Sequence, residues 1–286
     1  DPRSVLTLVK THNGESFIYT QQTYWRVNEF TEGSICLQAP ESDEDFYQSA
    51  IGFGTFQQML SDFPADKLYE TIPNFHNTPD RYRIFHEVLA RDPMGRAKSV
   101  KAEIDFALQR EKEMSTIYDA LVAGVLPLRV THNDTKLNNV LLDRITRKSL
   151  CVLDLDTVMP GLSLYDFGDS IRFGAATAAE DEQDISKMAL DLHLFEVYTR
   201  GYLEAATSLT QREIAMLPMG ALVMTLELAT RFLKDYLDGD LYFKTQYPEH
   251  NLVRARTQIR LVADMQKKME EMNRIVAQVS SQVREK

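Results

Sequence analysis

The 286-residue chain has little cysteine, fewer cations than anions and no long uninterrupted apolar run. Its two cysteines, Cys36 and Cys151, lie far apart, which excludes a disulfide framework or a cysteine-based zinc site and favours a reducing compartment. Lysine and arginine number 32 against 42 acidic residues, and the net charge of −10 excludes nucleic acid or an anionic membrane as the main partner. The longest uncharged apolar stretch, 214–226, is too short to span a bilayer and predicts a buried helix.

Apolar residues alternate over the first thirty positions, which is typical of strands. We expect strands at 5–9, 17–19 and 24–27, with a turn at His12-Asn13-Gly14. From Ser42 onward helical spacing dominates, and Ser42 with Asp45 predicts a helix N-cap. The expected helices after the one that Ser42 starts are 80–91, 99–123, 181–208, 211–237 and 252–283. One β-hairpin, 140–142 with 150–153, interrupts this helical body, so the fold class is α+β.

Polar residues that suit phosphoryl transfer flank this hairpin. His132, Asp134 and Asn139 precede its first strand, and Asp154 follows its second. A hairpin brings its two ends together, so these groups can converge on one site. Such a reaction needs a carboxylate near the attacking hydroxyl and hard oxygen ligands for Mg²⁺. Lys136 would direct a cation at the transferred phosphate.

This stretch resembles the catalytic loop of the aminoglycoside phosphotransferase and choline kinase superfamily, which shares the protein-kinase fold. The resemblance covers nearly the whole chain and implies ATP and Mg²⁺ as cofactors. It implies that Asp134 is the catalytic base, that Asn139 and Asp154 hold Mg²⁺, and that Asp156 assists the metal. His132 would brace the loop rather than react.

The same resemblance implies two lobes. Residues 1–33 would be a partial β-rich N-terminal lobe and hinge, and 34–286 a helical C-terminal lobe. Adenine would contact backbone groups around Glu29 and Thr31. A glycine-rich loop and an ATP lysine are not found in the sequence, so we expect further small-lobe residues before Asp1. Without them the chain would bind ATP poorly.

The sequence is most similar to kinases that phosphorylate the anomeric hydroxyl of N-acetylhexosamines. Their patterns appear at 154–161, 164–172 and 231–243. By this similarity Arg231, Asp238 and Tyr242 would contact a sugar, since charged groups grip hydroxyls and an aromatic ring covers an apolar sugar face. A choline kinase, an aminoglycoside kinase and a non-catalytic pseudokinase stay open as alternatives. ATP use, free cysteines and the lack of a signal segment predict a cytoplasmic protein, whose oligomeric state the sequence does not indicate.

Several motifs have competing interpretations. His132 and Asp134 could ligate a transition metal, but we do not favour this, because no further His or Cys lies nearby in the sequence. The motif Asp154-Leu155-Asp156-Thr157 resembles the nucleophile motif of haloacid-dehalogenase-type phosphatases. We do not favour this either, because the chain that follows is helical. Asp166-Phe167-Gly168 spells the metal motif of protein kinases, but no apolar strand precedes it. We therefore expect Asp166 to hydrogen-bond the catalytic loop. We also expect Lys10 on the surface and Gly52 and Gly54 in helix packing. His76 could approach the substrate cleft, but we favour a capping role before the helix at 80.

Overall fold

The computed structural model describes residues 1–285. Within this range the strands are short and form antiparallel sheets of two or three strands. They are β1 (Ile18–Thr20), β2 (Thr23–Trp25), β3 (Ser34–Cys36), β4 (Arg129–Thr131), β5 (Val140–Asp143), β6 (Ser149–Val152) and β7 (Met159–Gly161). The helices are α1 (Asp43–Met59), α2 (Thr78–Arg91), α3 (Lys101–Leu108), α4 (Glu111–Val122), α5 (Ser163–Gly174), α6 (Leu192–Ala205), α7 (Gln211–Asp238) and α8 (His250–Arg284).

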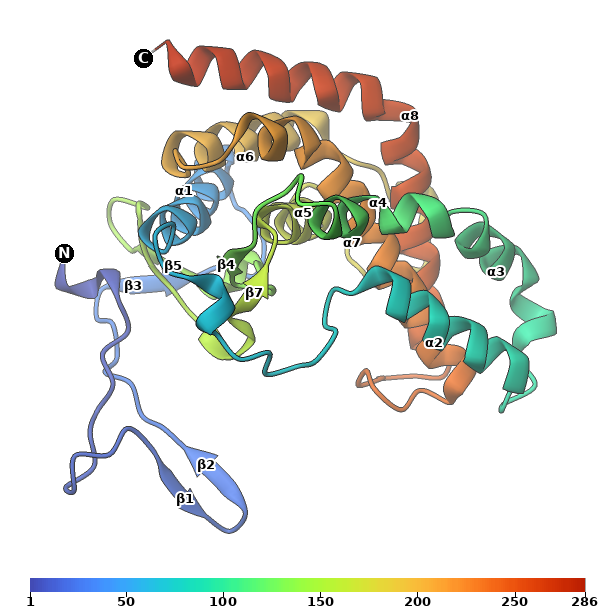
Figure 1. The fold of residues 1–286 in the computed structure, drawn as a ribbon, viewed down its shortest axis with the longest axis horizontal. Coiled ribbons are helices and arrows are strands. Elements are labelled where there is room, and N and C mark those ends of the chain that lie inside the picture. Colours follow the sequence, from blue (N-terminus) through green and yellow to red (C-terminus); the bar gives the residue numbers. More distant parts are fainter. Residues whose placement is uncertain (286) are drawn as a thin grey trace.

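The hairpin β1–β2 extends away from the helical body (Figure 1). The predicted turn at His12-Asn13-Gly14 is present, with Gly14 at φ 82°. The expected strand at 5–9 is wrong: only Leu8 forms an isolated bridge, to Asn28, because this segment has no sheet to join within the described residues. Trp25 and Tyr24 are 60% and 69% exposed, so the hairpin contributes little to the core.

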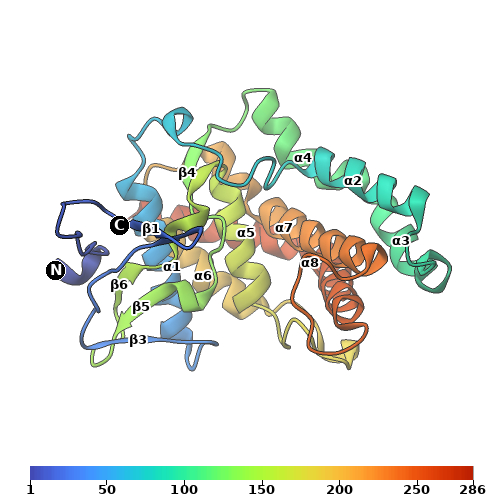
Figure 2. The ribbon, with the colours of Figure 1, turned by 90° about the horizontal axis from the view of Figure 1, so that it is seen from below.

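The predicted hairpin within the helical body is confirmed as β5–β6, and β3 pairs with β5 to complete a three-stranded sheet. This sheet lies at one end of the molecule and α2 and α3 lie at the other, with α5 and α7 between them (Figure 2). On the sheet side, α1 begins at its predicted cap, since the Ser42 side chain accepts a hydrogen bond from the Asp45 amide. The predicted packing role of Gly54 is confirmed: an added Cβ would lie 2.8 Å from the Tyr202 carbonyl oxygen.

Helix α7 is the central element of the core. Judged by length and composition alone it could cross a membrane, but 72% of its most apolar window is buried inside the protein, as expected for a core helix. It packs against α8 and crosses α5 closely at two glycines. A Cβ added to Gly168 would lie 2.5 Å from the carbonyl oxygen of Gly220, and one added to Gly220 would lie 2.8 Å from that of Leu164. The two backbones can approach this closely because neither glycine carries a side chain.

Two of the expected helices are shorter or split. The helix expected at 181–208 begins only at Leu192, because the Asp191 side chain caps it by accepting from the amides of His193 and Leu194. The stretch expected at 99–123 forms α3 and α4, which are separated at Arg110. The Arg110 side chain lies over the Phe106 ring and hydrogen-bonds Gln266 of α8, so a tertiary contact decides this break.

Candidate active site

Buried side chains of α5, Asp166 first among them, hold the loop between β4 and β5. Asp166 is fully buried and accepts hydrogen bonds from the amides of His132 at 2.9 Å and Asn133 at 2.8 Å, and from Gln57 Nε2 at 2.8 Å. Ser170, one turn further, donates to the Thr135 carbonyl at 2.8 Å. Asp166-Phe167-Gly168 therefore lies on a helix that supports the loop, and Asp166 makes the contacts expected of it.

His132 is also buried, and both of its ring nitrogens are used. Nε2 donates to the Leu153 carbonyl at 2.7 Å, while Nδ1 accepts from the Asp134 amide at 3.3 Å. Its ring packs edge-on against Phe53 and Phe56. These contacts leave no nitrogen for a transition metal. Among the described residues no group of three His, Cys, Asp or Glu side chains converges, which also disfavours that alternative.

Asp134 and Lys136 form a charged pair at the open side of the loop. Lys136 Nζ lies 2.8 Å from Asp134 Oδ1, and the Asn139 side-chain amide donates to Asp134 Oδ2 at 3.2 Å. Burial disfavours the Lys136 ammonium, but the charge of Asp134 and the hydrogen bond to it raise the pKa of Lys136 above its ordinary value. The lysine thus stays cationic at neutral pH beside a carboxylate that keeps lone pairs free.

Asn139 and Asp154, the expected metal ligands, are brought together by the backbone. The Leu153 amide donates to the Asn139 carbonyl at 2.8 Å, which sets Asp154 beside Asn139, and Asp154 is exposed at φ 54°. The Asn139 side chain uses its nitrogen on Asp134, so its oxygen is left for another partner. One amide oxygen and one carboxylate suit Mg²⁺, which takes its remaining oxygens from phosphate and water.

Asp156, which was expected to assist the metal, forms an exposed ion pair with Arg26, which follows β2. The pair links the N-terminal hairpin to the turn after Asp154. A role of Asp156 at the metal stays a prediction.

A cavity of about 410 Å³ opens beside Asp134 and Lys136. Arg231 and Tyr242, two of the expected substrate residues, line it together with this charged pair. The Arg231 guanidinium lies among three aromatic rings, 5.2 Å from the centre of Phe75, 5.7 Å from that of Tyr242 and 5.5 Å from that of Phe243. Glu227 and Arg231, which are spaced four residues apart on α7, therefore both face this cavity.

The structure places His76 in this cavity and contradicts its expected capping role. Asn77 is the N-cap of α2, because its side chain accepts from the Asp80 amide. His76 is 8% exposed, and its Nδ1 donates to Glu227 at 3.1 Å, while its Nε2 is buried without a partner. The sequence gives one indication that Glu227 faces a cavity, which is its i, i+4 spacing from Arg231.

Asp238 is not where the resemblance places it. It lies two turns, about 10 Å, beyond Arg231 along α7, and it does not line the cavity. Its carboxylate contacts Lys234 at 2.7 Å and Arg91 at 3.4 Å. Asp235, one turn after Arg231, faces the loop at 241–244 that follows α7, here called the substrate loop because Tyr242 is an expected substrate residue. It accepts from the amides of Tyr242 and Phe243, each at 2.9 Å.

Sequence reasoning missed a buried ion pair on α5. Arg172 lies 2.8 Å from Asp169 and 2.7 Å from Glu180, and Asp169 accepts from the Thr135 amide at 3.0 Å. Burial alone would raise the pKa of Asp169, but Arg172 and then Lys136 lower it below its ordinary value. The spacing of Asp166, Asp169 and Arg172 at helical intervals could have indicated that one helix face supports the loop.

Comparisons with known proteins agree with this geometry. The model of the phosphotransferase enzyme family matches residues 4–204. The chain belongs to this family. Its fold is similar to that of a microcompartment-associated aminopropanol kinase (TM-score 0.62, 16% identity, 94% of this chain and 77% of that chain). It is also similar to that of an aminoglycoside phosphotransferase from Alicyclobacillus acidocaldarius (TM-score 0.60, 13% identity, 99% of this chain and 79% of that chain). A third similar fold is that of choline kinase from Cryptosporidium parvum (TM-score 0.54, 13% identity, 98% of this chain and 77% of that chain). The kinase-like fold is thereby confirmed.

The hinge expected in this phosphotransferase keeps only some backbone groups free for adenine. The Glu29 amide donates to the Thr7 carbonyl at 2.8 Å, and the Thr31 carbonyl accepts from the Ser34 hydroxyl at 2.6 Å. The Glu29 carbonyl and the Thr31 amide would be left for adenine. One is an acceptor and the other a donor, which is the pair that an adenine edge needs.

Stability in acid should depend on Glu227, which is 1% exposed. Burial alone would raise its pKa, but His76 and then Arg231 lower it below the ordinary value. Because its pKa is lower in the folded protein than in the unfolded chain, ionised Glu227 stabilises the fold at pH values above the unfolded-state pKa of about 4.3. This stabilisation is lost as the pH falls through the lower folded-state pKa.

We expect the free energy of unfolding, measured with urea from about pH 7 to 3, to fall more steeply for the unchanged protein than for Glu227→Gln. The exposed Glu87→Gln is the control and should follow the unchanged protein. Parallel curves for the unchanged protein and Glu227→Gln would contradict the expectation. Other carboxylates with a lowered pKa contribute equally to all three curves, so the informative quantity is the difference in free energy of unfolding between the unchanged protein and Glu227→Gln at each pH.

Proposed function

We propose that this phosphotransferase moves the γ-phosphoryl group of ATP to a hydroxyl of a sugar-like small molecule, specifically the anomeric hydroxyl of an N-acetylhexosamine. The observation that carries the proposal is that Asp134 and Lys136 share one cavity with Arg231 and Tyr242. A base, a cation for the phosphate and side chains suited to hydroxyls and a sugar face thus lie around one space.

The chain's own residues fit an in-line transfer. The acceptor oxygen bonds to the γ-phosphorus as the bond from that phosphorus to the bridging oxygen of ADP breaks, and the acceptor proton passes to Asp134. Lys136 faces the transferred group with a positive charge, and Asp166 keeps the loop in place. Asn139 and Asp154 would hold Mg²⁺, which neutralises phosphate charge when bound.

The cavity is poorly suited to an aminoglycoside. Binding several ammonium groups needs unpaired carboxylates, yet each acidic side chain that lines this cavity within the described residues has a cationic partner. The pairs are Asp134 with Lys136, Asp169 with Arg172, Glu180 with Arg172, and Glu227 with Arg231.

Choline is disfavoured by a different observation. A quaternary ammonium group binds within a cage of aromatic rings. The rings available here, Phe75, Tyr242 and Phe243, already surround the Arg231 guanidinium. A second cation in the same place would be repelled, whereas a neutral hydroxylated ring could stack on Tyr242, which is 64% exposed.

The test is ADP release by the full-length protein with Mg-ATP and a panel of acceptors. We expect stimulation by N-acetylglucosamine or N-acetylgalactosamine and little by choline or kanamycin, and ³¹P NMR should show an anomeric phosphate ester. Stimulation by choline or kanamycin alone would overturn the sugar assignment. No stimulation by any acceptor would favour the non-catalytic alternative.

A further inference from the structure

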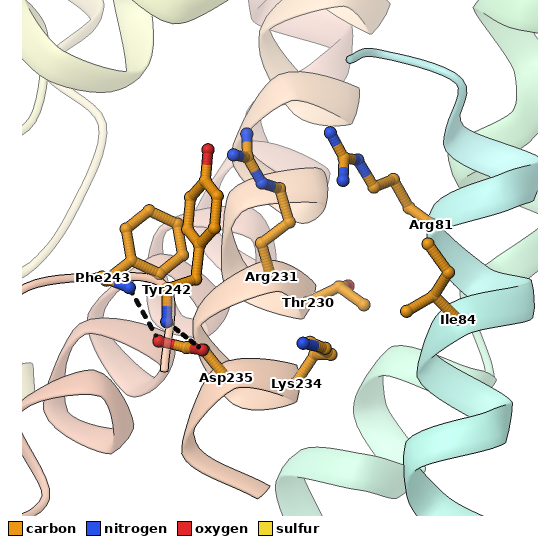
Figure 3. A pocket seen from close by; sticks show the side chains of 8 residues that line it. All are labelled: Arg81, Ile84, Thr230, Arg231, Lys234, Asp235, Tyr242 and Phe243. Atoms are coloured by element: carbon orange, nitrogen blue, oxygen red, sulfur yellow. Dashed lines mark hydrogen bonds between the residues drawn. The ribbon is translucent and has the colours of Figure 1, made fainter. Parts of the chain in front are cut away.

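A second, smaller cavity of about 130 Å³ adjoins the acceptor cavity. The two share Arg231, Tyr242 and Phe243, so a molecule in the larger one can extend a substituent into the smaller. Arg81 from α2 and Lys234 from α7 complete its cationic lining. In Figure 3 the guanidinium groups of Arg81 and Arg231 reach the same end of the cavity from opposite helices.

These cations outnumber the acidic residues that line the small cavity. Arg81 has no carboxylate within 4.0 Å among residues 1–285; its Nε and one terminal nitrogen donate to the Phe75 carbonyl at 3.1 and 2.6 Å. Arg231 lies 3.5 Å from Glu227, but that carboxylate is already bound by His76 at 3.1 Å.

The carboxylate that lines the small cavity offsets only part of this excess. Asp235 accepts from the amides of Leu241, Tyr242 and Phe243 and from the Asn251 side chain. Its oxygens are occupied in holding the substrate loop. Lys234 is paired with Asp238 and contributes less to the excess than the two arginines.

The arginines are held in place although they repel one another. The Arg81 guanidinium lies 6.0 Å from the centre of the Phe75 ring, and Arg231 lies 5.2 Å from the same centre. Burial, and next the charge of Arg231, lower the pKa of Arg81 below its ordinary value. Of these two partly buried guanidinium groups, only Arg231 has a carboxylate within 4.0 Å among residues 1–285, and that carboxylate also binds His76. The pair is therefore preorganised to bind a further anion, because planar donor forks match a carboxylate or a phosphoryl group.

We propose that this small cavity, formed by Arg81, Arg231 and Lys234, binds an anionic oxygen group carried by the phosphate acceptor. The inference rests on the proposed function and narrows its substrate class to sugars with a carboxylate or an existing phosphate ester. The hydroxyl to be phosphorylated lies at Asp134 while the anionic group lies between the two arginines. Arg81 is then a specificity-determining residue that nothing in the sequence motifs indicated.

The test compares kcat/KM for N-acetylglucosamine, glucuronic acid, N-acetylmuramic acid and N-acetylglucosamine 6-phosphate. We expect at least one anionic sugar to exceed N-acetylglucosamine by about tenfold, the order expected of a charge-assisted contact. The anionic sugar that gains distinguishes a carboxylate from a phosphate ester. Arg81→Gln should remove this preference, and Arg83→Gln, which changes an exposed arginine of the same helix, should keep it. A preference for the neutral sugar would overturn the proposal.

Two further measurements distinguish an anion-binding Arg81 from one that only supports the fold. If Arg81→Gln lowers kcat/KM for neutral and anionic sugars by the same factor, Arg81 is only structural and the proposal fails. If Arg81→Gln does not fold, competition by inorganic sulfate is measured with the unchanged protein. Sulfate should raise KM for the anionic sugar, and a KM that does not change with sulfate would overturn the proposed site. Calorimetric binding of the same sugars to Asp134→Asn needs no turnover, so absent catalysis would count against the proposed function alone.

Discussion

Replacing Asp134 by asparagine is expected to lower kcat for phosphoryl transfer by about 100-fold or more, the usual contribution of a positioned general base. Asparagine keeps the shape and still accepts a hydrogen bond from Lys136, but it cannot take the proton of the acceptor hydroxyl. The pair lies 2.8 Å apart at the edge of the cavity, so a loss of folding is not expected. Initial rates of ADP release with saturating ATP and sugar measure the effect.

Asp62→Asn is the matched control, because Asp62 is an exposed aspartate remote from the loop in sequence. Its kcat should equal that of the unchanged protein, and KM for ATP should be similar in both variants. If kcat of Asp134→Asn stayed within about twofold of the unchanged protein, Asp134 would not be the base. The cavity would then serve binding rather than chemistry.

Replacing Asp166 by alanine is expected to lower the free energy of unfolding by roughly 3 kcal/mol or more, because two buried backbone amides, of His132 and Asn133, lose their acceptor at about 1–3 kcal/mol each. The Gln57 side-chain amide loses a partner as well. The catalytic loop should then lose its fixed position, and kcat should fall together with stability. Urea unfolding followed by circular dichroism measures the first effect.

Asp119→Ala is the control for this variant. Asp119 is on α4, and its carboxylate accepts a hydrogen bond from the exposed Ser115 hydroxyl one turn earlier, so its loss should change stability by about 0.5 kcal/mol or less. Asp166→Asn should be intermediate, since one amide oxygen can replace one carboxylate oxygen. A stable Asp166→Ala with unchanged kcat would show that the other contacts of the loop, including those of Asp169 and Ser170, are enough to hold it.

The sequence was most informative where spacing and chemistry coincide. The hairpin 140–153 was predictable because two apolar runs flank a polar turn, and with it the meeting of Asn139 and Asp154. The cap at Ser42 and the buried character of α7 were predictable for similar local reasons. Each depends on residues that are near one another in the chain.

Contacts between distant segments were not predictable. His76 was assigned to a cap because the helix start was near, but its partner Glu227 lies 151 residues away. Asp238 was assigned to the substrate by resemblance, whereas its position two turns beyond Arg231 removes it from the cavity. Arg81 gave no signal at all, since an arginine on a helix is usually solvated, and only the packing of α2 beside α7 sets it against Arg231.

The close crossing of α5 and α7 at Gly168 and Gly220 has a consequence for how acceptor preference could diverge among related enzymes. Helix α5 supports the loop of Asp134, and α7 carries Arg231. Neither helix can move toward or away from the other without disturbing their backbone contact, so the distance between these two sides of the cavity is fixed. A larger or differently charged acceptor must therefore be accommodated on the opposite wall, by α2 and the 241–244 loop. Substitutions there can redirect specificity while leaving the chemistry intact.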